Sequence, residues 1–165
     1  MSLSLTSVEA LASAGAFDSF APDGDRTRLM WARLGGVPAG VRPRPTDPFD
    51  RADLELDLLG LTLEIHPAAL VRLRKGSGPD RAAGVLKPGK ELRFWALVVA
   101  EKTIPDRQGR AMQFVTLEDE TGLCEAVAFP DAYQRRRRPY LVGEVTEARG
   151  RSVRQDGIAV LELKG

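Results

Sequence analysis

Residues 114–133, FVTLEDETGLCEAVAFPDAY, read as two β-strands that meet at a tight turn. Apolar and polar side chains alternate on both sides of DETG, and a period of two is typical of a strand with one buried face. Asp119, Thr121 and Gly122 are residue types that form turns, and Gly122 supplies backbone freedom. FPDAY ends the second strand, and PDAYQRRRR, which begins within it, allows two turns of helix. The stretch therefore predicts a hairpin inside a β domain.

The same alternation runs through the second half of the chain. Strands are expected at 91–104, 111–119 and 123–129, and, after the short helix, within 140–150 and 152–164 as a hairpin around QDG. Five strands with a helix between the third and the fourth follow the order of an OB-fold, a small Greek-key barrel. Another small β-barrel or a sandwich is the alternative. We predict a five-stranded OB-fold β-barrel over residues 90–165.

Residues 1–76 are predicted to be helical, with a proline-rich linker in the middle. Thr6 and Glu9 match a capping box at the start of a helix that should stop near Gly15. A second helix is expected within 23–36. Two more follow the linker VPAGVRPRPTDPF, the last beginning at Pro67. Residues 77–89 read as a connector, so the predicted fold class is α+β: a helical segment and linker ahead of the barrel.

The composition excludes several classes of function. A net charge of +1 draws the chain neither to nucleic acid nor to a membrane as a whole, so any attraction must come from local clusters. With Cys124 and His66 each alone of their kind, a disulfide framework, a structural zinc site and a Ser–His–Asp triad are disfavoured. Neighbouring carboxylates in LEDETG point to opposite strand faces, so we expect no catalytic residue and no metal. The expectation is a cytoplasmic protein with no membrane span and no cofactor.

Three motifs together resemble one known family. FVTLEDETG followed by FPDAY is similar to the OB domain near the C-terminus of the bacterial C-family DNA polymerases, the polymerase III alpha subunits. LASAGAFDSF, at 11–20, looks like the end of that family's tandem helix-hairpin-helix region. LLGLTLEIHPAALVR, at 58–72, looks like the segment that joins this region to the OB domain. The hairpin alone also resembles the anticodon-binding OB domains of class II tRNA synthetases, so the order of all three motifs carries the resemblance.

The resemblance implies a fragment of a larger polymerase whose OB domain holds single-stranded template DNA, in replication or in error-prone repair synthesis. The fragment itself is expected not to be an enzyme, because the family's catalytic carboxylates belong to a palm domain. The HPAALVR motif favours the error-prone branch, and the replicative branch stays open. Expected partners are single-stranded DNA and other domains or subunits of a polymerase complex. The linker RPRPTDPFD lacks the Gln of the family's clamp-binding peptide, so clamp binding is not assigned.

The fold predicts where a nucleic acid would bind. An OB barrel binds on strands 2 and 3, between the loops that join strands 1–2 and 4–5. Single strands are held by aromatic platforms and by basic side chains. Because Val115 and Leu117 suit the core, Phe114 should face outward and stack on a base, with Thr116 on the same face and Glu125 on the next strand. The alternative is that a bulge turns Phe114 into the core.

Further candidates lie on the flanking strands and loops. Trp95 should face the outside of the first strand, either as a second platform or packed against the helical half. Two basic clusters complete the set: Lys102, Arg107 and Arg110 between strands 1 and 2, and Arg149, Arg151 and Arg154 around strands 4 and 5. The run 135–138 of four arginines is expected to cap the short helix or to contact another domain.

Two other functions fit the same residues. One is a protein-interaction module that recruits a replication or translesion partner. It predicts little salt-dependent affinity for DNA and an apolar exposed patch that includes Trp95. The other is a stand-alone RNA-binding OB protein, which predicts a preference for RNA over DNA.

Overall fold

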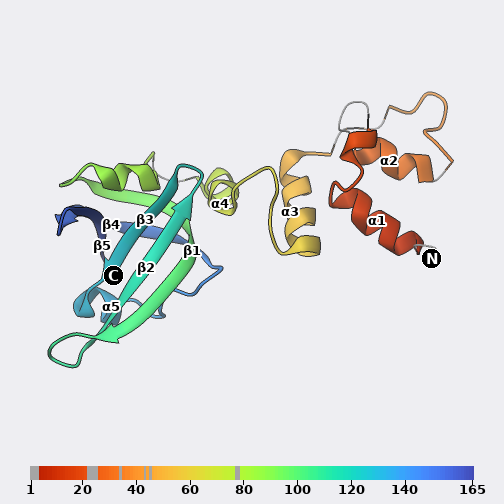
Figure 1. Ribbon diagram of the computed structural model, residues 1–165. Helices are drawn as coiled ribbons and strands as arrows, with labels where there is room; N and C mark the ends of the chain where they lie inside the picture. Colours follow the sequence, from red (N-terminus) through yellow and green to blue (C-terminus); the bar gives the residue numbers. More distant parts are fainter. Residues whose placement is uncertain (1–3, 22–25, 34, 43, 45, 77–78) are drawn as a thin grey trace. The chain divides into compact units, whose positions relative to one another are not determined.

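The chain forms two compact units, a helical unit that ends at Ile65 and a barrel unit, His66–Gly165. The computed structural model describes residues 4–21, 26–33, 35–42, 44, 46–76 and 79–165 (Figure 1). The sequence grouped 67–76 with the helical half. In the structure this stretch is helix α4, Pro67–Lys75, and it belongs to the barrel unit because it contacts β1, β2 and β4.

The described residues of the helical unit form three helices and one short 3-10 turn. They are α1 Leu5–Ser13, the turn η1 Asp18–Phe20, α2 Arg26–Arg33 and α3 Pro48–Leu59. The expected capping box is wrong, because Ser4 is the N-cap of α1 and its hydroxyl accepts a hydrogen bond from the Ser7 amide at 3.1 Å. Helix α3 begins beside the N-cap Asp47 and ends at Gly60, whose φ of 72° favours glycine.

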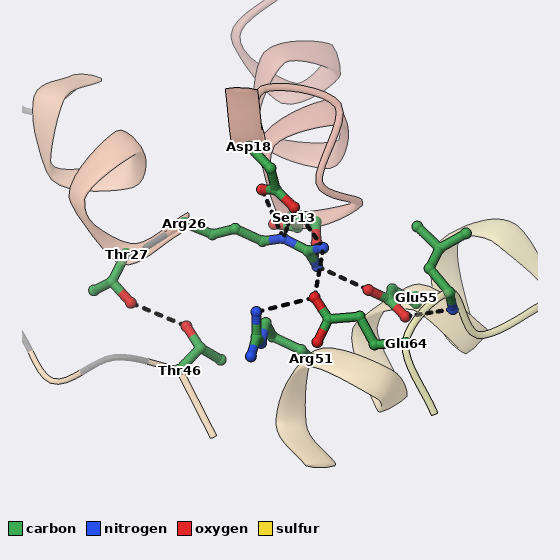
Figure 2. Close-up of polar contacts among 9 residues, drawn as sticks. Ser13, Asp18, Arg26, Thr27, Thr46, Arg51, Glu55 and Glu64 are labelled. Atoms are coloured by element: carbon green, nitrogen blue, oxygen red, sulfur yellow. Dashed lines mark hydrogen bonds and ion pairs between the residues drawn. The ribbon is translucent and has the colours of Figure 1, made fainter. Parts of the chain in front are cut away.

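A buried arginine ties the helical unit together (Figure 2). The Arg26 side chain is only 4% exposed. Its Nε donates to Asp18 Oδ1 at 2.9 Å, and its NH1 donates to Glu55 Oε1 at 2.9 Å and to the Ser13 carbonyl at 3.1 Å. Glu55 in turn accepts from the Leu63 amide at 2.8 Å. A buried charge is tolerated when it is paired and hydrogen-bonded, so this network connects α1, η1, α2, α3 and the segment after α3.

The barrel unit is a closed five-stranded barrel, which confirms the predicted OB-fold. Its strands are β1 Glu91–Pro105, β2 Ala111–Asp119, β3 Gly122–Ala128, β4 Val145–Gln155 and β5 Ile158–Leu163, with α5 Pro130–Arg135 between β3 and β4. The order around the barrel is β1-β2-β3-β5-β4. Every pairing is antiparallel except that of β3 with β5, which is parallel.

The barrel core follows the expected alternation, with one irregularity. Phe94, Ala96 and Val98 of β1 are buried in the same core cluster as Val115 and Leu117 of the adjacent β2, as the sequence predicts. Between Val98 and residue 100 the register with β2 shifts. Beyond this bulge the outward side chains of β1 lie beside the outward side chains of β2, so the second half of β1 widens the outer face of the β2–β3 hairpin.

The turn between β2 and β3 anchors the segments that precede the barrel. Asp119 is buried, and its Oδ2 accepts from the Ala82 amide at 2.8 Å, at the start of the 3-10 helix η2 Ala82–Leu86. Glu120 Oε1 lies 2.6 Å from Arg72 of α4 and 2.7 Å from Arg81. The DETG carboxylates therefore have structural partners.

Helix α4 begins as the sequence predicts. His66 is its N-cap, with Nδ1 accepting from the Ala68 amide at 3.1 Å, and Pro67 occupies the first turn. Among the residues that the structure describes, no helix is long and apolar enough to cross a membrane.

Candidate nucleic-acid interface

The outer surface of the β2–β3 hairpin carries a solvent-exposed aromatic ring. We call this surface the β2–β3 face; its side chains are Met112, Phe114, Thr116, Glu118, Leu123, Glu125 and Val127, of which Val127, the register partner of Phe114, is buried. The side chain of Phe114 is 42% exposed, so it lies outside the barrel rather than in the core. Because the neighbours of Phe114 along β2 point inward, its position is fixed by the pleat of the strand. An exposed ring on a rigid strand is suited to stacking on a base.

Lys102 lies beside Phe114. The expected strand 91–104 already contains Lys102, although Lys102 was grouped with the arginines between strands 1 and 2; in the structure β1 runs to Pro105 and carries Lys102. Its register partner on β2 is Phe114. The bulge in β1 changes which side chains beyond residue 98 face outward, and strand alternation alone does not reveal it. The register therefore places Lys102 beside Phe114 on the outer surface.

Thr116 and Glu125 form a polar pair in the middle of the face. They are directly opposite in the β2–β3 register, and the Thr116 hydroxyl lies 3.2 Å from Oε1 and 3.3 Å from Oε2 of Glu125. Ala100 flanks the pair on β1 and Val160 flanks it on β5. Within the described ranges, Glu125 makes no ion pair.

The β1–β2 loop presents one constrained and one open arginine. Asp106 accepts from the amides of Gln108 and Arg110 at 2.8 and 2.9 Å, which closes the loop. These backbone hydrogen bonds, that of Arg110 foremost, lower the pKa of Asp106. The Arg110 side chain is held by Asp106 at 3.0 Å and by Asp131 of α5 at 3.4 Å. Arg107 is exposed and has no ion pair among the described residues. Figure 1 shows this hairpin reaching beyond the rest of the barrel.

The β4–β5 hairpin lies at the opposite end of the face. Its turn is formed by Asp156 and Gly157, with φ of 51° and 84°. Glu125 pairs with Val160 in parallel register, which places the start of β5 and this turn beside the start of β3. The β1–β2 loop adjoins the other end of β3. The face therefore has arginines at both ends: Arg154 is exposed near the β4–β5 turn, and the loop arginines lie at the other end. The two ends are separated by the length of β3, about 20 Å.

Trp95 lies on a different side of the barrel. It is on the first half of β1, opposite Glu147 of β4, and it is half-buried. The Lys75 ammonium of α4 lies 5.0 Å from the centre of the indole ring. The indole Nε1 is buried and has no hydrogen-bond partner among the described atoms. Trp95 therefore packs beside α4, which belongs to the barrel unit.

Arg149 and Arg151 share that side with Trp95. Glu147 accepts from Arg93 at 2.6 Å and from Arg149 at 2.5 Å. Partial burial raises the pKa of Glu147, and the hydrogen bonds from the two arginines outweigh it and lower the pKa overall. Arg151 lies opposite Glu91 and Glu162 in the sheet register. The structure thus separates these two arginines and Trp95 from the β2–β3 face.

The arginine run after α5 is partly structural. The Arg136 guanidinium lies 3.6 Å from the ring centre of Tyr140, and its NH2 donates to the Thr146 hydroxyl at 3.1 Å. Arg138 pairs with Glu144. These contacts hold the segment between α5 and β4 against the barrel, a role that sequence alone did not separate from capping of the helix.

Sequence reasoning overlooked Glu118 and Leu123 as parts of the face. Glu118 was weighed only as a metal ligand or acid–base residue and set aside, yet it lies opposite Leu123 on the outer surface, and Leu123 is exposed. The period of two from Phe114 through Thr116 already points to Glu118. The face therefore combines an aromatic ring, one lysine and two carboxylates.

The described part of the chain shows neither a metal-binding cluster nor a reactive thiol. It contains no group of three or more His, Cys, Asp or Glu side chains that could hold a metal ion. Burial raises the pKa of the Cys124 thiol to about 12. The thiol is therefore protonated near neutral pH and serves as a small core residue.

Comparison with known proteins identifies the barrel and its relatives. Residues 85–164 match the family model described as OB-fold nucleic acid binding domain. The error-prone DNA polymerase of Burkholderia mallei (strain ATCC 23344) is 33% identical over 150 residues, covering 87% of this chain and 14% of that protein. The error-prone DNA polymerase of Anaeromyxobacter dehalogenans (strain 2CP-C) is 32% identical over 177 residues, covering 93% of this chain and 15% of that protein. This chain thus spans about a seventh of the length of these curated relatives.

Partial matches among solved structures include two domains from other proteins. The second OB-fold domain of replication protein A from Methanococcus maripaludis has a TM-score of 0.37 and 18% identity, covering 47% of this chain and 82% of that one. The SSB domain of a Synechococcus protein has a TM-score of 0.40 and 11% identity, covering 46% of this chain and 90% of that one.

The sequence relatives, together with the OB-fold match, confirm the predicted resemblance: this chain is related to the bacterial polymerase III alpha-type DNA polymerases and corresponds to their OB region.

Proposed function

We propose that the β2–β3 face binds single-stranded DNA and that, in a polymerase of this type, it holds the template strand during replication or error-prone repair synthesis. The observation that carries the proposal is the exposed Phe114 ring beside Lys102. A base can stack on the ring while the ammonium group contacts the adjoining phosphate. Such stacking accepts any base, because every base has a π-face.

The ends of the face suit a phosphate backbone. Arg107 and Arg110 lie at the β1–β2 loop, and Arg154 lies near the β4–β5 turn. Neutralising phosphates releases counterions, so binding should weaken as salt rises. A face about 20 Å long fits a site near the lower end of the roughly 4–16 nucleotides that OB folds bind.

Trp95, Arg149 and Arg151 have no part in this primary contact in our proposal. They lie on the β1–β4 side, where Lys75 covers the indole ring and Glu147 neutralises part of the arginine charge. We also propose that the chain binds without catalysing a reaction, because the described residues bring together no nucleophile and base and no metal ligands.

The test is fluorescence anisotropy of a labelled single strand of mixed sequence, titrated with the protein at two salt concentrations. Because a stacked base contributes about 1–3 kcal/mol, Phe114→Ala should weaken binding roughly 5- to 150-fold. Lys102→Gln should weaken binding and reduce its dependence on salt. Arg149→Gln is the matched control, since it removes a charge from the β1–β4 side, and it should change the affinity little.

Three results would overturn the proposal. Equal affinity of wild type and Phe114→Ala would move the strand off the β2–β3 face. Failure to bind at low salt would favour the protein-interaction module instead. Tighter binding of an RNA strand of the same sequence would favour the RNA-binding alternative.

A further inference from the structure

The centre of the β2–β3 face carries a negative charge where a polyanion is proposed to bind. Glu125 is exposed in the middle of β3, and the Thr116 hydroxyl is its hydrogen-bond partner. No cation pairs with Glu125 within the described ranges. Lys102 lies one row away, beside Phe114. A phosphate would be repelled at Glu125, so the backbone of a bound strand must run elsewhere and a base must lie nearer this carboxylate.

The geometry of the strands places Glu125 within reach of a stacked base. Glu125 is opposite Thr116, and Thr116 lies two residues from Phe114 on the same face of β2. Glu125 is therefore a diagonal neighbour of Phe114, and such neighbours are about 7–8 Å apart, within reach of long side chains. A base on the Phe114 ring extends beyond the ring and can present its edge to this carboxylate.

The chemistry of the carboxylate selects among base edges. An ionised carboxylate only accepts hydrogen bonds, and here a single hydroxyl is shared between its two oxygens. Acceptor positions are left for donors from a ligand. Cytosine, adenine and guanine each carry an exocyclic amino group, whereas thymine presents carbonyl oxygens on either side of its one ring N–H. The carboxylate attracts the amino edges and repels the thymine carbonyls.

We propose that Glu125, positioned by Thr116, reads the edge of the base held at Phe114 and favours bases that carry an amino group over thymine. The inference rests on the proposed single-strand function and narrows it. Stacking on Phe114 alone would accept any base, whereas a contact with Glu125 makes the site prefer bases that carry an amino group.

The experiment compares affinities for oligo-dC and oligo-dT of equal length at slightly alkaline pH, where cytosine is unprotonated. For wild type we expect about fivefold tighter binding of oligo-dC, near the low end of what a specific base contact contributes. Glu125→Gln should bring the ratio close to one, because an amide both donates and accepts. Glu118→Gln is the matched control on the same face. It removes the same charge two residues beyond Thr116, so it should raise both affinities alike and leave the ratio unchanged.

The ratio separates base reading from general electrostatics. A wild-type ratio of one, or a preference for oligo-dC that persists in Glu125→Gln, would overturn the inference and leave the proposed function intact. Absence of binding to either oligonucleotide and to the mixed-sequence strand would overturn both. Loss of the preference in Glu118→Gln as well would assign the bias to the overall charge of the face and would also overturn the inference.

Discussion

Glu120 joins the β2–β3 turn to the segments that precede the barrel, and its removal gives the sharpest test of how the barrel unit is held together. Its carboxylate contacts Arg72 of α4 at 2.6 Å and Arg81 at 2.7 Å. Glu120→Gln keeps the shape of the side chain and removes the charge. The substitution should loosen α4 and the connector without disturbing the barrel core.

The size of the effect follows from the pKa of Glu120. Partial burial raises this pKa, but the hydrogen bond and charge of Arg72, with a contribution from Arg81, outweigh burial and lower it from 4.5 to about 2. Each pKa unit corresponds to about 1.4 kcal/mol, so the unscreened contribution to stability is about 3 kcal/mol. The side chain is 31% exposed, and solvent screening reduces the expected loss to roughly 1–2 kcal/mol.

The pH dependence carries a definite sign. Because the pKa in the folded state lies below the ordinary value, the stabilisation is fully present above about pH 4.5 and is lost as the pH falls toward 2. Urea unfolding, followed by tryptophan fluorescence, measures the free energy of unfolding for wild type and Glu120→Gln across this range. The two curves should be separated at pH 7 and converge near pH 2.

Glu118→Gln is the control, since it makes the same change two residues earlier, on β2, where the described residues provide no ion pair. A double-mutant cycle with Arg72→Gln should show coupling at pH 7. Equal stabilities of Glu120→Gln and wild type at pH 7, or a difference that stays constant down to pH 2, would refute the assigned role of the ion pair.

Three further substitutions test the packing. Gly150→Ala should destabilise the barrel by about 1–3 kcal/mol, because its Cβ would collide with the Glu162 carbonyl across the β4–β5 ladder; an unchanged melting temperature would contradict this. Gln113→Leu should cost about 1–3 kcal/mol in urea unfolding, since the buried amide of Gln113 bonds both the N–H and the carbonyl of Tyr140, and both would lose their partner. Arg26→Met should remove helical circular-dichroism signal from the helical unit, because it leaves the buried carboxylate of Glu55 without its ion-pair partner; full retention of that signal would contradict the network.

The barrel could be predicted from the sequence because its strands alternate cleanly. Val115 and Leu117 are buried and Phe114 is exposed, as the period of two requires. The position of Lys102 could not be predicted, since a bulge in β1 changes which side chains face outward and leaves no mark in the alternation. Trp95 was correctly assigned to the outer side of β1, but only the structure shows that α4 packs beside it.

The helical unit was predicted less completely. The helices follow from their periodicity, yet Ser4 rather than Thr6 caps the first of them, because polar residues at both positions satisfy the same local rule. The burial of Arg26 depends on Asp18 and Glu55, which lie 8 and 29 residues away in the sequence. Such long-range charge pairing depends on tertiary contacts, so local sequence patterns do not predict it.

The central claim, that a single strand lies on the β2–β3 face, is tested most directly by NMR titration of the isotope-labelled protein with a single-stranded oligonucleotide. We predict that the backbone amide signals of 112–118, 123–127 and the β1–β2 loop shift on binding, while those of 93–97 and 147–151 on the β1–β4 side stay in place. Shifts confined to the β1–β4 side, around Trp95 and Arg149, would contradict the claim and place the oligonucleotide on the arginines of that side.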